Sequence, residues 1–209
     1  MKAMILVLSP EECAKLMNGD LSVLVRKKFP KDYVGPVFVY CKKDKKMELL
    51  KGPALYEKEE IPFIAQGGLL NIDDFLNGKV IASFLCDKVG EIYFGASALE
   101  SKRIVDWICN DIFSFEKEAC LTQEDLDKYL GNVKHSPQGY AIHITNLEIF
   151  DKPKELKDFY KFGLKKEQER LYSALQAMAG YYSFRNEFAE LKSKYQLTCA
   201  PSNFCYVEV

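Results

Sequence analysis

A run of three basic residues, Arg26, Lys27 and Lys28, is the first place in this sequence where binding chemistry is expected. The planar guanidinium of an arginine can hold a phosphate through two parallel hydrogen bonds. Neighbouring lysines can add contacts to backbone phosphates that do not depend on base sequence. We therefore predict that Arg26 and Lys27 contact phosphate. The alternative, that the run is an ordinary solvated end of a strand, stays open at this point.

Three further polar or aromatic residues are candidates for the same site. Tyr40 lies in the same basic part of the chain and could stack on a nucleobase, although packing in a core is the commoner fate of a tyrosine. Ser9 could offer its hydroxyl or a helix N-terminus to an anion, or could simply cap that helix. His143 stands among apolar strand residues, which suits either a satisfied buried histidine or a hydrogen-bond donor that lines a cleft.

The sequence gives little support for catalysis or metal binding. His135 and His143 are the only histidines, and no nucleophile motif such as G-x-S-x-G accompanies either. No Cys, Asp or Glu stands near them at the spacing of metal ligands. We therefore expect no catalytic residue, no metal and no cofactor.

Composition places the chain among ordinary globular proteins, with 48% hydrophobic and 28% charged residues. The longest apolar run, Ala3–Leu8, is too short to span a membrane or to form a signal peptide. The 7 cysteines are scattered, with no C-x-x-C pair, so we expect reduced core residues rather than disulfides or zinc ligands. These features predict a cytoplasmic protein without membrane contact.

Charge is divided unevenly along the chain although the net charge is only −1. Residues 21–52 carry a net charge of +6, whereas residues 53–150 carry −8. Such a division can create a positive surface that attracts phosphates. Lysines that protect a strand edge from pairing are an equally good explanation.

Alternating or apolar segments predict a sheet, and Ser9-Pro10 begins a short helix that Asn18-Gly19 ends. The expected strands are Ala3–Leu8, Leu21–Val25, Pro36–Tyr40, Lys79–Cys86, Tyr140–Phe150 and Phe204–Val209.

The other segments divide into a loop and two helical regions. Residues 51–75 contain several Gly and Pro and read as a long loop. Residues 98–130 have a helical apolar stripe, and residues 154–195 predict a long amphipathic helix, or two helices broken near Gly180. We predict a single domain over residues 1–209, with a helical insertion at about residues 154–196 before the final strand.

Four segments, taken in order, resemble the ASCH domain family, a branch of the PUA-like superfamily, in the versions common in phages and Firmicutes. The first is the strand and short helix that lead into Arg26-Lys27-Lys28-Phe29-Pro30. The others are Gly78–Asp87, Gly139–Leu147 with the following Phe150–Pro153, and the closing Ala200–Glu208. Together they cover about half of the chain. The resemblance implies an α+β fold, a small and mostly antiparallel PUA-like β-barrel with surrounding helices.

The resemblance also implies an RNA- or nucleotide-binding cleft between the barrel wall and the first helix. In some members a Lys, a Thr and a Glu hydrolyse acylated cytidine nucleosides. At the matching positions this sequence has Leu21, Leu24 and Ser83, and leucine supplies neither a nucleophile nor a base. We therefore infer that this chemistry has been lost.

Our first prediction is thus a non-catalytic RNA- or nucleotide-binding protein. Arg26, Lys27 and Tyr40 would contact phosphate and base, with Ser9 as a further anion contact and Ser22, Ser83 and His143 lining the cleft. Two alternatives remain: a hydrolase of modified nucleosides with rearranged groups, and a phage-type protein-interaction or anti-defence factor whose partner binds residues 155–195.

Overall fold

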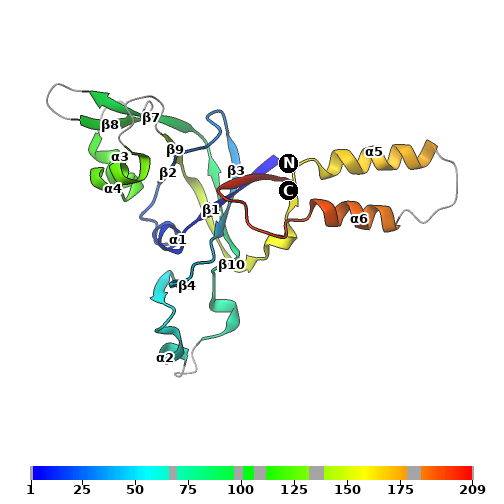
Figure 1. Cartoon of the computed structure of the whole chain (residues 1–209), viewed down its shortest axis with the longest axis horizontal. Helices are drawn as coiled ribbons and strands as arrows, with labels where there is room; N and C mark the ends of the chain where they lie inside the picture. The colour runs from blue at the N-terminus through cyan, green and yellow to red at the C-terminus, as the bar shows by residue number, and fades with distance from the viewer. Residues whose placement is uncertain are drawn as a thin grey trace.

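The computed structural model describes residues 2–65, 70–96, 101–105, 112–131, 139–177 and 185–208, and these form two main sheets (Figure 1). The larger sheet has the order β10 (Thr145–Lys154), β6 (Val80–Cys86), β3 (Gly35–Cys41), β1 (Lys2–Leu8), β12 (Phe204–Glu208) and β11 (Tyr160–Lys161). The smaller has the order β2 (Val23–Arg26), β9 (Gly139–His143), β7 (Val89–Ala96) and β8 (Ser101–Val105). A separate hairpin pairs β4 (Met47–Leu50) with β5 (Ala54–Glu57).

Helices lie between and around these strands. They are α1 (Pro10–Met17), α2 (Ile61–Ala65), α3 (Ile112–Ala119), α4 (Gln123–Leu130), α5 (Leu164–Ala177) and α6 (Arg185–Tyr195), with short 3₁₀ turns η1 (Ile72–Asp74) and η2 (Leu156–Asp158). No helix in the described ranges is long and apolar enough to cross a membrane.

The predicted α+β class with mostly antiparallel strands is confirmed. Among the described strands, every pairing is antiparallel except that of β1 with β3, which is parallel. Within the same residues the pairings make two open sheets and a hairpin, and none of them closes a sheet on itself. The body is therefore two facing sheets rather than a fully hydrogen-bonded cylinder.

The apolar run at the start of the chain becomes a strand that is buried on both faces. Successive side chains of a strand point to opposite sides. Met4, Leu6 and Leu8 accordingly join the main core between the sheets, together with α1 and the inner faces of β2 and β9. Ala3 and Ile5 join a second core on the other side, together with Leu156 of η2 and Leu197, which follows α6. This double burial explains why the run has no polar alternation.

A third core holds α3 and α4 against the smaller sheet. Val23 and Val25 of β2 pack there with Leu126 and Leu130 of α4. Leu24 points the other way, into the main core. Strand β2 is an end strand of its sheet, so the space between α1 and α4 opens along its unpaired edge.

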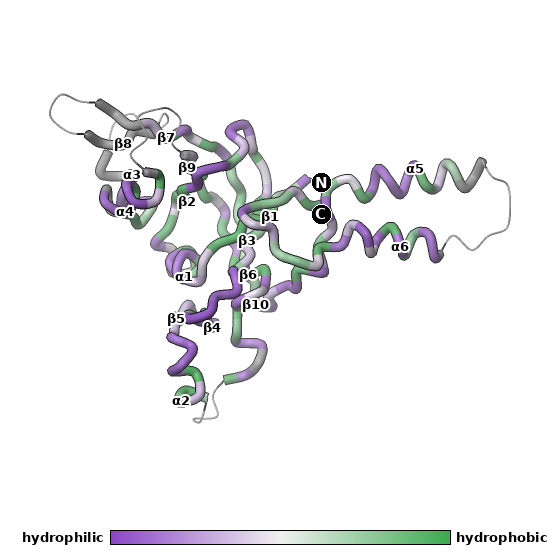
Figure 2. The backbone as a smooth tube through the Cα atoms, viewed as in Figure 1, coloured by the Kyte–Doolittle hydropathy of each residue, from purple (hydrophilic) through white to green (hydrophobic). Residues whose placement is uncertain are grey.

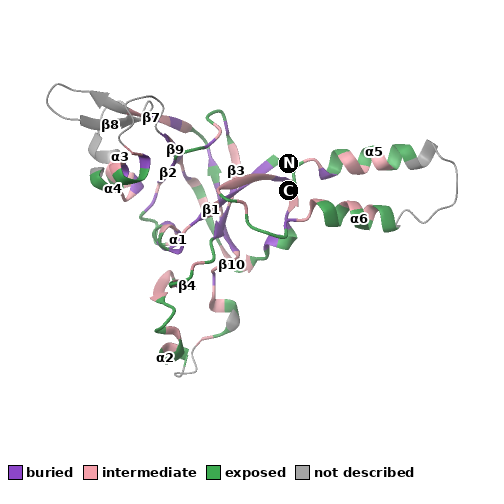
Figure 3. Ribbon diagram, viewed as in Figure 1, coloured by how far each residue is buried: buried purple, intermediate pink, exposed green. Residues whose placement is uncertain are grey.

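Two arms extend from this body. The helices α5 and α6 pack side by side and project to one side, and β4, β5 and α2 project in another direction (Figure 1). The hydrophobic stretches concentrate in the central strands, whereas the described parts of both arms carry many hydrophilic residues (Figure 2). Burial follows the same division, with the buried residues centred on the sheets (Figure 3).

The structure confirms most of the strands expected from the sequence and both α5 and α6, while the suggested break at Gly180 lies outside the described residues. Several expectations were wrong. The single strand expected over Tyr140–Phe150 is two strands, β9 and β10, which belong to different sheets. The helical region expected from residue 154 begins only at Leu164, after η2 and β11. Residues 51–75 are not only loop, since they contribute β5 and α2. The described part of residues 98–130 contains strand β8 as well as α3 and α4. Strand β8 pairs with β7, so a long-range partner overrides the local helical pattern there.

The described cysteines are free thiols, and half of them are buried: Cys13, Cys41 and Cys86. Burial raises the pKa of Cys13 well above its usual value and that of Cys86 to about 11. A thiol must ionise to react, so these side chains behave as small core residues.

Candidate functional site

A hydrogen-bonded network joins the start of α1 to the end of β2. Ser9 is the N-cap of α1: its Oγ accepts a hydrogen bond from the Glu12 backbone N–H at 3.2 Å. In return the Glu12 Oε2 accepts from the Ser9 backbone N–H at 2.9 Å, which completes a capping box. The Ser9 backbone N–H and the oxygen of its hydroxyl therefore take part in the cap, and the contact of Ser9 with an anion stays a prediction.

Arg26 grips the same carboxylate with both ends of its guanidinium. Nη1 lies 2.7 Å from Glu12 Oε1 and Nη2 lies 3.2 Å from Oε2. Nη1 also donates to the Val25 carbonyl at 2.7 Å, and Nη2 approaches the Val7 carbonyl at 3.4 Å. Arg26 is only 6% exposed. A phosphate would compete with Glu12 for these N–H groups, and the contact of Arg26 with phosphate stays a prediction.

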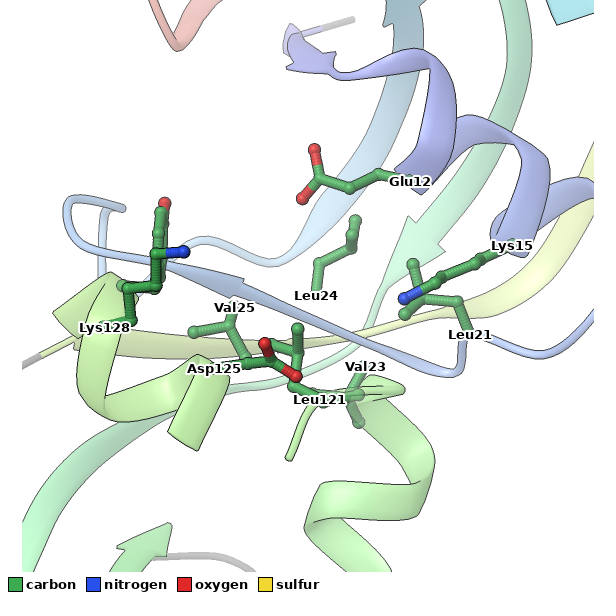
Figure 4. Close-up of a pocket in the computed structure, with 11 residues that line it drawn as sticks. Glu12, Lys15, Leu21, Val23, Leu24, Val25, Leu121, Asp125 and Lys128 are labelled. Atoms are coloured by element: carbon green, nitrogen blue, oxygen red, sulfur yellow. The ribbon is translucent and has the colours of Figure 1, made fainter. Parts of the chain in front are cut away.

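Beside this network lies a cavity of about 450 Å³ between α1, β2 and α4, which we call the first cavity (Figure 4). Its floor is apolar and includes Leu21, Leu24 and Leu121. Four charged side chains and one aromatic ring also line it: Glu12 and Lys15 from α1, and Asp125, Lys128 and Tyr129 from α4. The first cavity therefore combines an apolar floor with two positively and two negatively charged side chains.

The charges around the first cavity neutralise one another. Asp125 accepts hydrogen bonds from the Thr122 backbone N–H at 3.0 Å and from its hydroxyl at 2.8 Å. These bonds, together with the positive charges of Lys15 and Lys128, lower the pKa of Asp125. Lys15 Nζ donates to the Cys120 carbonyl at 3.1 Å, which ties α1 to the end of α3.

Tyr129 connects the first cavity with the basic run of the sequence. Tyr129 is 40% exposed and lines the cavity. Lys27 Nζ lies 5.3 Å from the centre of the Tyr129 ring, a cation–π distance. Lys27 thus stands at the rim, although it is not part of the cavity wall.

The remaining predicted site residues do not gather here. Tyr40 lies on the opposite face of the larger sheet and lines a second cavity. His143 pairs through Nδ1 with Asp87 Oδ1 at 2.6 Å. Burial alone would raise the pKa of Asp87, but the hydrogen bond and charge of His143 lower it. Ser22, which directly precedes β2, and Ser83 of β6 are half-buried, and neither lines the first or the second cavity.

The sequence reading missed most residues that line the first cavity. One signal was present: Asp125, Lys128 and Tyr129 stand three and four positions apart and therefore share one face of α4. A second was the Ser-x-x-Glu pattern of Ser9 and Glu12, which is typical of a capping box. Neither pattern reveals that α1 and α4 face each other.

Comparisons with known proteins concern the fold. No protein-family model and no curated protein matches the chain. One similar solved structure is ASCH from Zymomonas mobilis, with a TM-score of 0.41 and 14% sequence identity over 78% of this chain and 77% of that chain. A second is a point variant of the Zymomonas mobilis protein, with a TM-score of 0.43 and 13% sequence identity over 79% of this chain and 81% of that chain. Both are ASCH proteins, the family that the sequence motifs resemble. The phage or Firmicutes subtype stays a prediction.

Proposed function

We propose that the protein binds RNA or a nucleotide, with a base in the first cavity and phosphates on the lysines around it. The observation that carries the proposal is the combination of an apolar floor, the exposed ring of Tyr129, and three nearby lysines, Lys15, Lys27 and Lys128. Single-stranded nucleic acids are bound by stacking of bases on aromatic rings beside basic groups.

The two carboxylates of the cavity have a role in the same proposal. Ionised carboxylates are acceptors only, so Glu12 and Asp125 suit the amino groups of a base rather than a phosphate. Arg26 holds the Glu12 carboxylate in place through its two contacts, and we assign it a positioning role. In this role Arg26 supports binding by orienting Glu12 and does not itself contact the ligand.

Stacking is tested with a pair of tyrosine variants. Tyr129→Ala is expected to weaken binding of a short single-stranded RNA about 5- to 150-fold, since stacking contributes about 1–3 kcal/mol per base. Tyr172→Ala is the matched control, because Tyr172 on α5 is 53% exposed and lies outside the cavity. Fluorescence anisotropy measures both. Equal affinities for the two variants would refute the proposal.

Phosphate contact is tested by salt dependence. Replacing Lys128 by Ala is expected to reduce the slope of log K against log salt by about 0.7, the value for one phosphate contact on a single strand. Lys152→Ala, an exposed lysine on β10, removes the same charge outside the cavity and should leave the slope nearly unchanged. A slope that responds equally to both substitutions would indicate attraction by net charge alone.

One observation favours a second candidate, a hydrolase of acylated or otherwise modified nucleosides. Glu12 and Lys15 lie three residues apart on α1 and line the same cavity as Leu21 and Leu24, the positions where the family resemblance would place Lys and Thr. A carboxylate and a lysine are the group types such a reaction uses. Turnover of N4-acetylcytidine that Glu12→Gln abolishes would support it, and the absence of turnover would leave binding as the function.

A further inference from the structure

A second cavity of about 630 Å³ lies on the opposite face of the larger sheet from the main core. It opens between the end of β3, the turn η2 and the segment that follows α6. Three lysines line it, Lys42, Lys43 and Lys157, together with the single carboxylate Glu155. The lining therefore has an excess of positive charge, whereas that of the first cavity is balanced.

The lysines come from segments far apart in the chain and converge on one space. Lys42 and Lys43 follow β3, and Lys157 belongs to η2. Lys42 is fixed through its backbone, whose N–H donates to the Leu8 carbonyl at 2.8 Å. A cavity that gathers lysines in this way attracts anions, because like charges brought together raise the local positive potential.

Gly78 permits the position of Lys43. A Cβ added at Gly78 would lie 2.6 Å from Lys43 Cε and 3.2 Å from its Cγ, so the lysine stem rests directly on the glycine backbone. Gly78 has a φ of +86°, a conformation that other residues rarely adopt. The glycine in the turn before β6 therefore leaves room for the Lys43 side chain, which lines the cavity together with Gly78.

Tyr40 is the buried polar residue of this cavity. It is only 5% exposed, and within the described part of the chain no residue exchanges a hydrogen bond with its hydroxyl. Buried hydroxyls almost always have a partner, so a water molecule or a ligand in the cavity is expected to supply one here. Burial, and then the nearby Cys41 and Glu155, raise the pKa of Tyr40, which keeps the hydroxyl protonated as a donor.

We propose that the second cavity binds the phosphate group of a small phosphate monoester. Lys42, Lys43 and Lys157 hold the phosphate oxygens, and the Tyr40 hydroxyl donates a hydrogen bond to the ligand. The apolar residues Leu156, Leu197 and Ala200 contact the organic part. Glu155 opposes a second phosphate and suits a hydroxyl of the ligand. This site is separate from the first cavity and does not depend on the proposed function there.

The proposal is tested with two probes, phenyl phosphate and inorganic phosphate. Binding of each probe to the full chain is measured from changes in its NMR chemical shifts. Phenyl phosphate is expected to bind several-fold more tightly than inorganic phosphate. Lys43→Ala and Lys157→Ala are each expected to weaken binding about tenfold, and Tyr40→Phe about threefold. The matched control Lys152→Ala, and Tyr129→Ala in the first cavity, should change it less than twofold. Equal effects of Lys157→Ala and Lys152→Ala, or saturable binding of neither probe, would overturn the proposal.

Cys199 gives an independent readout in the unmodified protein. Its thiol is exposed and lines the second cavity. Saturating phenyl phosphate should slow its alkylation by iodoacetamide at least threefold, as followed by peptide mass spectrometry. Cys120, which lies at the end of α3 away from this cavity, should react at an unchanged rate. Equal rates at Cys199 with and without bound phenyl phosphate would contradict the proposed location.

Discussion

The first and second cavities use similar residues and yet differ in electrostatic character. Both are lined by lysines, by at least one carboxylate and by a tyrosine. In the first, two lysines face two acids and Tyr129 is exposed, whereas in the second three lysines face one acid and Tyr40 is buried. The first cavity is therefore suited to a flat uncharged ring, and the second to an anion.

The comparison teaches that a basic residue in the sequence is not by itself a basic site. Arg26 was the strongest candidate for phosphate binding, and its guanidinium is taken up by Glu12. Lys42 and Lys43 lie outside the basic run Arg26–Lys28. Among the described residues, neither has a carboxylate at salt-bridge distance. Whether a basic side chain has a carboxylate partner, rather than how many basic residues there are, therefore decides whether it can bind an anion.

The largest effect is expected from breaking the ion pair beside the first cavity. Arg26→Ala removes the hydrogen bonds of a buried guanidinium, but the Glu12 side chain left behind is 36% exposed and can be hydrated, so the free energy of unfolding should fall by about 2 kcal/mol. Lys27→Ala, one residue further along, should change it by less than about 0.5 kcal/mol because that side chain is exposed. Urea unfolding measures both. A fully stable Arg26→Ala protein that no longer binds RNA would instead assign Arg26 to the ligand.

The cap of α1 is expected to give the next largest effect. Ser9→Ala removes the hydroxyl that accepts from the Glu12 N–H and should cost about 1 kcal/mol of unfolding free energy. Because Glu12 also holds Arg26, the Ser9→Ala and Arg26→Ala losses should not be additive. A double-mutant cycle followed by thermal unfolding checks this coupling, and simple additivity would show that the two contacts act independently.

In the second cavity the corresponding change should not destabilise the protein. Tyr40→Phe removes a buried hydroxyl that has no hydrogen bond within the described residues, so the unliganded protein should keep its stability to within about 1 kcal/mol or gain slightly. Urea unfolding in phosphate-free buffer is the measurement. A loss above about 2 kcal/mol would reveal a structural partner of the hydroxyl and would weaken the contrast between the cavities.

The smallest effect concerns the pair of His143 and Asp87, which lines neither cavity. The pKa of Asp87 is lowered in the folded protein, so the pair contributes stability above the unfolded value of about 3.9 and loses it as pH falls through the folded value. Asp87 is 43% exposed, and the contribution should be below about 1 kcal/mol. Asp87→Asn should reduce stability at pH 6, and this loss should shrink as the pH falls below about 3.9 towards the folded pKa, as urea unfolding will show.

Much of the secondary structure could be predicted, because it depends on neighbouring residues. Apolar runs and alternation located β1, β3 and β6, and the start of α1 at Ser9-Pro10 and its end at Asn18-Gly19 were predicted correctly. Strand β8 was mistaken for helix because its stability comes from pairing with β7. Of the site, the sequence indicated the region around Arg26 but neither Lys15 nor Tyr129. The protein partner of residues 155–195 stays a prediction.

The sequence by itself determined strands such as β1, β3 and β6, the cap of α1 and the division of charge, since each follows from preferences that act over a few residues. The tertiary structure alone decided that Glu12 meets Arg26, that α4 brings Tyr129 opposite α1, and that Lys157 joins the lysines that follow β3. These contacts join groups from separate elements, and their closeness depends on how sheets and helices pack rather than on any local preference.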